Sequence, residues 1–364
     1  MSGGPMQPRR IAVNGKYIGA PLNGVHRTAA RYTRALLDRA GPTAEVEVLS
    51  PRAPPEGMFA PGTVGVRRGP FGAGQGWEML TLPRLARGRL LVNFCNVGPL
   101  LHGNSVVMIH DAQTFLYPGD YTGRQAVAYR ALLPLIGRRA RRVLTVSEFS
   151  RRSLAEHGIA PLGKIDVVHN GTDHLLDAPA DPGALARFGL IPGGYALTLG
   201  SPKSYKNMGR LFAAFADAAL ALPLVLAGGP GREAYDASHG PIPDKTVFTG
   251  RIEDGALRAL YEGARLFVFP SRTEGFGLPP VEAMHCGTPV VAARAGAVPE
   301  VCDGAARLVD PEDTGAWRSA IASVVSDDGL AGDLIARGRQ RAASLTWERA
   351  GARLWECLDA LANG

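Results

Sequence analysis

The sequence predicts an α/β protein made of two doubly wound domains, each built on a parallel sheet. Short apolar segments that suit buried strands alternate with helical patterns along the chain, which is typical of βαβ units. This alternation stops near residue 177 and then starts again. The length of 364 residues also exceeds what one hydrophobic core usually supports, so two domains are expected.

The first half of the chain contains strand and helix signals in turn. Strands are expected at 11–13, 46–49, 90–94, 106–109, 143–146 and 165–168. Helices are expected at 25–40, 125–136 and 148–156. The stretch 51–76 is rich in proline and glycine, and we expect a surface loop around one or two short strands there.

The second half repeats the pattern after a turn at 170–173 and a linker-like stretch at 177–182. Strands are expected at 195–199, 222–227, 246–248, 266–269, 290–293 and 306–309, with a helix at 208–221 and a mostly helical segment from 313 onward. The predicted domains are therefore residues 1–176 and 177–345, facing each other across a cleft. A last helix within 346–364 is expected to cross back onto the first domain.

Composition indicates an ordinary soluble globular protein, with 46% hydrophobic and 20% charged residues. No apolar run approaches the roughly 20 residues that a membrane helix needs. Residues 1–10 lack the apolar core of a secretory signal. The scattered cysteines Cys95, Cys286, Cys302 and Cys357 are expected to be free thiols of a cytoplasmic protein, and neither disulfides nor metal ligands.

The net charge of +7 is unevenly distributed. Residues 1–180 contain 22 Lys and Arg against 12 Asp and Glu, a balance of +10, whereas the remainder contains 18 against 21, a balance of −3. One cluster consists of Arg138, Arg139, Arg141, Arg142, Arg151 and Arg152. Without zinc-finger spacing or an aromatic RNA-binding signature, nucleic acid is not an expected partner. A solvated face and contact with an anionic membrane surface or acidic acceptor both stay open.

The most informative segment runs from Ser271 to Glu282. It follows an apolar strand, and Pro279 and Pro280 suit the first turn of a helix. The backbone N–H groups of 275–278 would then face the crevice above the strand ends and form an anion site. Carboxylates at Glu274 and Glu282 beside such a site suit a ligand with phosphates and hydroxyls, such as a nucleotide sugar.

Two other loops carry candidate groups. Lys203 and Lys206 lie between a strand and a helix, where an ammonium can neutralise a diphosphate as it becomes a leaving group. His110 follows the strand at 106–109, where it can bond a sugar or take part in proton transfer, although a structural histidine held by Asp111 is the alternative.

The string Glu-Gly-Phe-Gly-Leu-Pro-Pro-Val-Glu, followed by Gly287-Thr288-Pro289, resembles the retaining glycosyltransferases of family 4, which have the GT-B fold. The resemblance places Glu274 by the donor sugar hydroxyls and Glu282 by the nucleotide ribose. It assigns the backbone of Gly275, Phe276, Gly277 and Leu278 to the sugar and diphosphate. It implies that the first domain binds the acceptor and the second the donor.

The same resemblance covers nearly the whole chain. It makes Lys206 one member of the family's basic pair; Tyr205 occupies the other position, so Lys203 is expected to substitute. His110 is placed near donor sugar and acceptor, Gly24 in a glycine-bearing loop near phosphate, and Arg251 by the nucleobase, where a guanidinium can stack. A plain turn and a surface arginine are the alternatives for the last two.

The implied reaction moves a hexose from a nucleotide-diphosphate sugar to a hydroxyl of a glycan or lipid-linked acceptor, by same-face attack without a metal or cofactor. The sequence Pro-Lys-x-x-Lys-Asn resembles that of mannosyltransferase-like members of the family, and this resemblance implies GDP-mannose as the donor, with a UDP-hexose as the alternative. A sugar-nucleotide epimerase and a non-catalytic binder stay open. A nicotinamide oxidoreductase is disfavoured because Gly-x-Gly-x-x-Gly is missing. The expected location is the cytoplasm, with the inner membrane face as an alternative.

Overall fold

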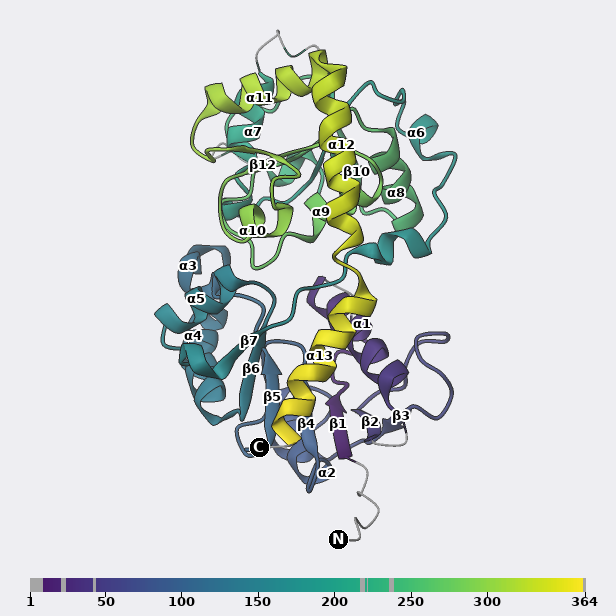
Figure 1. Cartoon of the computed structure of the whole chain (residues 1–364). Helices are drawn as coiled ribbons and strands as arrows, with labels where there is room; N and C mark the ends of the chain where they lie inside the picture. The colour runs from purple at the N-terminus through teal and green to yellow at the C-terminus, as the bar shows by residue number, and fades with distance from the viewer. Residues whose placement is uncertain are drawn as a thin grey trace. The chain divides into compact units, whose positions relative to one another are not determined.

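The computed structural model describes residues 9–20, 24–41, 44–216, 220, 222–235 and 239–362. The described chain divides into two compact units, coloured in Figure 1 from purple at the N-terminus to yellow at the C-terminus. The first unit contains the described parts of 1–116, 121–170 and 347–364, and the second contains those of 117–120 and 171–346. The assignment of acceptor to one domain and donor to the other stays a prediction.

The first unit is built on a parallel sheet that has seven strands among the described residues, in the order β3-β2-β1-β4-β5-β6-β7. The strands are β1 Arg9–Asn14, β2 Ala44–Ser50, β3 Val64–Val66, β4 Leu90–Asn93, β5 Ser105–Met108, β6 Arg142–Thr145 and β7 Ile165–Val167. Apolar residues fill the strands because parallel sheets are covered on both faces. The strand order reverses between β1 and β4, and the carboxyl ends of strands at such a point are where open α/β sheets bind ligands.

Helices lie on both sides of this sheet (Figure 1). They are α1 Gly24–Arg39, η1 Trp77–Thr81, α2 Leu82–Leu85, α3 Gln113–Leu116, α4 Gly123–Arg139, α5 Glu148–Glu156, η3 Leu162–Lys164 and α13 Trp347–Ala362. The last helix, α13, packs against α1, where a Cβ added to Gly351 would lie 2.6 Å from that of Ala35. The C-terminal helix therefore belongs to the first unit, as the sequence predicts.

The second unit has a parallel sheet with six strands among the described residues, in the order β10-β9-β8-β11-β12-β13. The strands are β8 Ala196–Leu199, β9 Leu224–Ala227, β10 Thr246–Gly250, β11 Leu266–Phe269, β12 Val290–Ala293 and β13 Arg307–Val309. The helical segments are η2 Pro118–Asp120, η4 Asp173–Asp177, α6 Ala184–Arg187, η5 Ser204–Lys206, α7 Met208–Phe215, η6 Arg232–Ala234, α8 Asp254–Gly263, α9 Leu278–His285, α10 Val298–Cys302, α11 Thr314–Ser326 and α12 Asp328–Ala343.

These elements confirm the α/β class, the two parallel sheets and the predicted strands. The helix expected at 208–221 is shorter in the structure, because α7 ends at Phe215 with Ala216 as its C-cap and Leu220 is not helical. Residues 217–219 and 221 of the predicted range lie outside the described residues. The sequence reading missed η1 and α2. Trp77 there is fully buried, and Pro83 suits the start of α2 instead of ending a helix.

Candidate active site

The loops after β8 and β11 meet at the point where the second sheet reverses its strand order. β8 pairs with β9 on one side and with β11 on the other, all in parallel. The loop after β8 leads to η5, and the loop after β11 leads to α9. Such a switch point is where open α/β sheets bind ligands.

Lys206 and Glu274 come from these two loops and are in direct contact. The Lys206 Nζ donates to Glu274 Oε1 at 2.7 Å, with the two side chains 21% and 13% exposed. The ammonium also lies 5.3 Å from the centre of the Tyr205 ring and 5.4 Å from that of Phe269. Ring faces attract cations, so these rings help to hold the lysine beside its carboxylate.

The loop between Glu274 and α9 has the backbone that the sequence predicts. Gly277 precedes the helix with φ at +94°, a conformation that favours glycine, and the prolines occupy the first turn of α9. Gly275, Phe276 and Gly277 are buried. The loop is packed closely against its neighbour, since a Cβ on Gly296 would lie 2.6 Å from the Glu274 nitrogen.

Glu282 is buried on α9, 7% exposed, and both of its carboxylate oxygens have partners. The His174 Nε2 lies 3.2 Å from Oε1, and the Tyr261 hydroxyl donates to Oε2 at 3.3 Å. Burial next to this carboxylate raises the pKa of Tyr261 well above its ordinary value, so the tyrosine keeps its proton to donate. Glu282 is thus held in one orientation by two residues that the sequence reading did not select.

His110 follows β5 in the first unit and is buried. Its Nε2 lies 2.8 Å from the carbonyl oxygen of Phe94, and its backbone N–H donates to Asn96 Oδ1 at 2.8 Å. A carbonyl only accepts, so Nε2 carries the proton and Nδ1 offers a lone pair. Burial lowers the pKa of His110, while the bond to Phe94 opposes that shift, so the ring is neutral near pH 7.

The remaining predicted residues are less enclosed. Lys203 is half-buried, with Nζ 5.7 Å from the centre of the Tyr205 ring. Arg251 is exposed after β10. Gly24 begins α1, and a Cβ there would meet nothing within 4 Å. Residues 21–23 of its predicted loop lie outside the described residues. The roles of all these residues stay predictions.

A second polar cluster, at the carboxyl ends of β1 and β4, was also missed. Lys16 Nζ donates to Glu78 Oε2 at 2.6 Å, and Asn14 donates to Glu78 Oε1 at 2.7 Å and to Asn93 Oδ1 at 2.9 Å. Lys16 is visible in the sequence just after the first strand. Glu78 lies in η1, the segment not recognised as helical, so its pairing with Lys16 could not be found.

The cysteines are free thiols, as expected. Burial raises the pKa of Cys95, Cys286 and Cys302 to about 12, so these thiols are poor nucleophiles at neutral pH. Within the described ranges, no three His, Cys, Asp or Glu side chains gather as a metal site. Over the same ranges, each helix is too short or too polar to cross a membrane.

Family models match both units. The one described as "Glycosyltransferase Family 4" matches residues 22–174, and "Glycosyl transferases group 1" matches 193–341. O-antigen chain mannosyltransferase B of Escherichia coli is 32% identical over 258 residues, which cover 67% of each chain. This chain belongs to the family 4 glycosyltransferases. Its two parallel sheets and its relatives agree with the GT-B fold expected from the sequence.

Two other matches are a mannosyltransferase sequence and a solved glycosyltransferase-like structure. The GDP-mannose-dependent alpha-(1-6)-phosphatidylinositol monomannoside mannosyltransferase of Mycolicibacterium smegmatis is 32% identical over 250 residues, 63% of this chain and 65% of the relative. The structure of Anabaena HepE in complex with UDP-glucose has a TM-score of 0.74 and 18% identity, covering 97% of this chain and 99% of that one. At that identity the structural likeness shows the fold alone.

Proposed function

We propose that this glycosyltransferase moves mannose from GDP-mannose to a hydroxyl of a glycan or lipid-linked acceptor, with retention of the anomeric configuration. The Lys206–Glu274 pair at the switch point carries the proposal, because it combines a cation for a diphosphate with an acceptor for sugar hydroxyls. The choice of mannose as the transferred sugar rests on two relatives that are named mannosyltransferases, one of them GDP-mannose-dependent.

The chemistry follows from where charge develops. As the glycosidic bond breaks, negative charge grows on the leaving diphosphate. The ammonium of Lys206, with Lys203, neutralises it, together with the amides of residues 275–278 at the start of α9. Glu274 exchanges its lysine partner for hydroxyls of the sugar earlier, when the donor binds.

The positively charged groups named above make a metal unnecessary for this step, so we propose a reaction without metal or cofactor. Glu282 accepts hydrogen bonds from the ribose, with its orientation fixed by His174 and Tyr261. Arg251 stacks on the base, and Gly24 lets the first domain's loop approach phosphate. His110 is neutral, and its Nδ1 can accept a hydrogen bond from a hydroxyl of the donor sugar or of the acceptor substrate.

A thermal-shift panel tests the donor, since a ligand that binds only the native state raises Tm. We expect GDP and GDP-mannose to give larger shifts than UDP and UDP-glucose at equal concentration. A larger shift with UDP would indicate that the donor is a UDP-hexose and not GDP-mannose. No shift with any nucleoside diphosphate would contradict the function. Release of an epimer from GDP-mannose alone would favour an epimerase.

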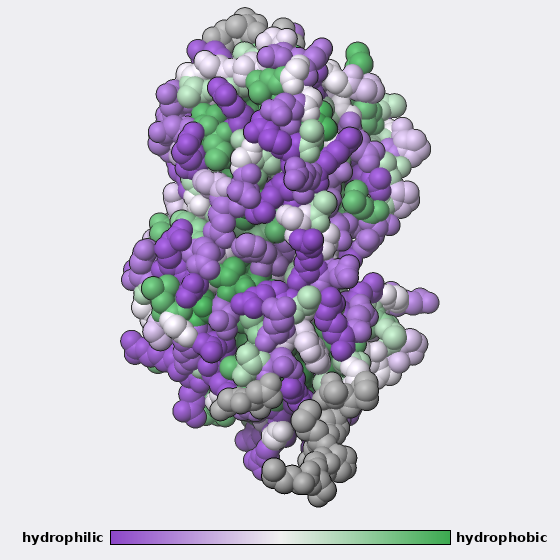
Figure 2. Space-filling view, in the orientation of Figure 1, coloured by the Kyte–Doolittle hydropathy of each residue, from purple (hydrophilic) through white to green (hydrophobic). Residues whose placement is uncertain are grey.

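We further propose that the first unit contacts an anionic membrane surface that presents the acceptor. Helix α4 exposes Val127 and Leu135, at 69% and 50%, and ends in Arg138 and Arg139. In Figure 2, hydrophobic residues lie among hydrophilic ones on the side of this unit where Figure 1 labels α3, α4 and α5. Exposed apolar side chains beside arginines suit anionic lipid.

Vesicle flotation tests this contact. We expect binding to vesicles rich in anionic lipid at low salt, weakened by high salt and by Leu135→Ser. Neutral vesicles serve as the control. If the protein does not bind anionic vesicles at low salt, the proposed membrane contact is wrong. The basic residues of the first unit would then form a face that is exposed only to solvent.

A further inference from the structure

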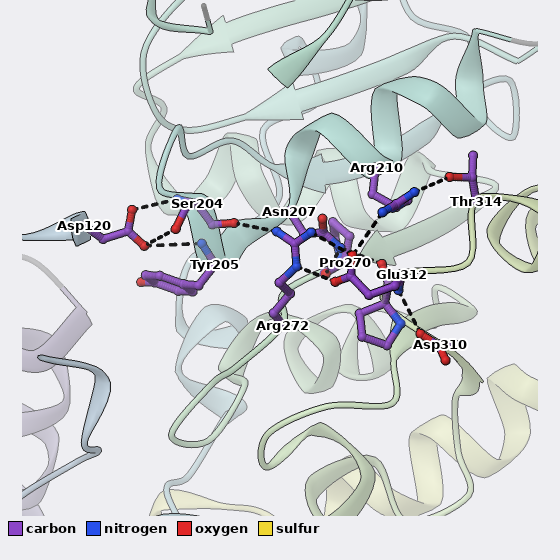
Figure 3. A network of polar contacts seen from close by, with 11 residues as sticks. Asp120, Ser204, Tyr205, Asn207, Arg210, Pro270, Arg272, Asp310, Glu312 and Thr314 are labelled. Atoms are coloured by element: carbon purple, nitrogen blue, oxygen red, sulfur yellow. Dashed lines mark hydrogen bonds and ion pairs between the residues drawn. The ribbon is translucent and has the colours of Figure 1, made fainter. Parts of the chain in front are cut away.

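The short turn η5, which carries Lys206, is held at its start by a carboxylate from a distant part of the chain. Asp120 Oδ1 accepts from the backbone N–H of Ser204 at 2.8 Å. Its Oδ2 accepts from the Ser204 hydroxyl at 2.8 Å and from the N–H of Tyr205 at 3.3 Å (Figure 3). Asp120 precedes Ser204 by 84 residues and lies in the segment 117–120, which groups with the second unit.

The turn needs such a partner because it is too short to stabilise itself. η5 has three residues, and Lys203 at its N-cap makes no side-chain cap hydrogen bond. The first N–H groups of a helical turn have no acceptor within it, and a side-chain oxygen is one of the groups that can satisfy them. Asp120 does this with a charged acceptor, which forms stronger hydrogen bonds than a neutral one.

The rest of the turn is held by the loops that follow β11 and β13. Arg272 donates from Nη1 to the Ser204 carbonyl at 3.1 Å and from its backbone to the Tyr205 carbonyl at 2.7 Å. At the end of the turn, Asn207 adopts φ +56° and donates from Nδ2 to the carbonyls of Pro270 and Pro311, at 3.2 and 2.8 Å. The first two amides of the turn, those of Ser204 and Tyr205, donate to Asp120.

The segment 117–120 also touches the turn through an aromatic ring. The Tyr117 and Tyr205 rings lie 5.8 Å apart between centres. The same Tyr205 ring also contacts the lysine, because it is one of the two rings over which the Lys206 ammonium lies. Both the backbone and the ring beside Lys206 are therefore supported from the same short segment.

From this geometry we infer that Asp120 is a positioning residue for Lys206. By fixing the first amides of η5, it holds the ammonium where the diphosphate departs. The inference rests on the role proposed for Lys206. Catalytic groups must be held closely, and a displacement of about 1 Å costs on the order of 100-fold in rate. Loosening the turn would thus lower turnover although Asp120 itself need not touch the donor.

A double-mutant cycle tests the inference, with GDP release from GDP-mannose as the rate and calorimetric Kd for GDP as a second readout. We expect Asp120→Ala to lower turnover about 10- to 100-fold and to weaken GDP binding. Lys206→Ala should lower turnover about 100- to 1,000-fold. In the Lys206→Ala background, adding Asp120→Ala should change turnover by less than about 3-fold, because a residue acting through the lysine has nothing left to position.

Three further variants serve as a control, a partial removal of the contact and a substitute for Asp120→Ala. Asp333→Ala removes an exposed carboxylate from α12 of the same unit and should leave turnover unchanged. Ser204→Ala removes only the hydroxyl donor and should give a smaller loss than Asp120→Ala. Should Asp120→Ala fail to fold, Asp120→Asn, which keeps one acceptor oxygen, takes its place in the cycle with a smaller expected loss.

Full turnover by the Asp120 variant, or an equal loss with and without Lys206, would overturn the inference. In that case an impaired Lys206→Ala would leave the proposed function standing. If Lys206→Ala turned over GDP-mannose at the normal rate, the role of the lysine would be wrong and the inference about Asp120 would fall with it.

Discussion

The ammonium of Lys206 donates to the carboxylate of Glu274 at 2.7 Å, although 68 residues separate them in the chain. They meet because β8 and β11 are neighbours at the point where the sheet reverses its order. In this structure each charge neutralises the other. A donor would separate them, with its diphosphate taking the cation and its sugar hydroxyls the anion.

Replacing Glu274 by alanine is expected to remove the acceptor for sugar hydroxyls and to leave the lysine without its carboxylate. Turnover of GDP-mannose should fall about 100- to 1,000-fold, as for loss of one preorganised transition-state group. The measurement is GDP release, with Tm recorded beside it. An exposed acid of the same unit, Glu262, provides the control variant Glu262→Ala. Normal turnover by the Glu274 variant would point to a binder without catalysis or to a misplaced site.

Glu282→Gln preserves shape but removes the charge that His174 and Tyr261 hold in place. We expect Kd for GDP to rise about 10-fold, since hydrogen bonds to a charged group contribute about 1.5–3 kcal/mol. Calorimetric titration with GDP measures this. Tyr261→Phe, which frees one carboxylate oxygen, should weaken binding less. Unchanged GDP affinity in Glu282→Gln would show that the ribose lies elsewhere.

Two histidines, the buried His110 and the half-buried His285, predict the direction of the pH dependence of stability. Burial is the main cause that lowers the pKa of His110 and of His285 below the ordinary 6.5. Between the lowered and ordinary pKa values the unfolded chain binds more protons than the folded one, so the free energy of unfolding rises with pH. Stability should therefore be full above pH 6.5 and decrease as the pH falls below it.

Urea unfolding at pH 7.5 and 5.5 measures this effect of the histidines. His110→Gln cannot bind a proton there and should lose less stability than the wild type between the two pH values. An equal or greater loss in the variant would mean that His110 is not held neutral by burial.

Glu78→Ala should destabilise the first unit. The carboxylate is 2% exposed and accepts from both Lys16 and Asn14, so its removal leaves two buried or half-buried donors without that acceptor. We expect a loss of about 2–4 kcal/mol in the free energy of unfolding. Denaturant unfolding checks this. Glu56→Ala, at an exposed acid of the same unit, should leave the free energy of unfolding within about 0.5 kcal/mol. A similarly small change for Glu78→Ala would contradict the cluster's structural role.

The sequence predicted those features that depend on residues close together in the chain. The apolar run before Pro270, the glycine at 277 and the two prolines together indicate strand, loop and helix, and the structure has them as β11 and α9. Alternating apolar segments similarly predicted two parallel sheets. The contact of Lys206 with Glu274 was not stated from the sequence, but both residues were selected because each follows a strand.

Partners that meet through tertiary packing could not be predicted in this way. His174 follows the turn at 170–172, and nothing nearby in the sequence connects it with Glu282. Asp120 lies in a short segment between α3 and α4 that gives no signal of its contact with η5. Glu78 was missed because proline and glycine around η1 and α2 resemble a loop, although Trp77 anchors them in the core.

A crystal structure of the protein soaked with GDP-mannose tests the central claim most directly. We predict the diphosphate against Lys206 and the amides of residues 275–278, the mannose hydroxyls on Glu274 and the ribose hydroxyls on Glu282. A donor bound away from the loops that follow β8 and β11, or one that neither carboxylate touches, would contradict the account.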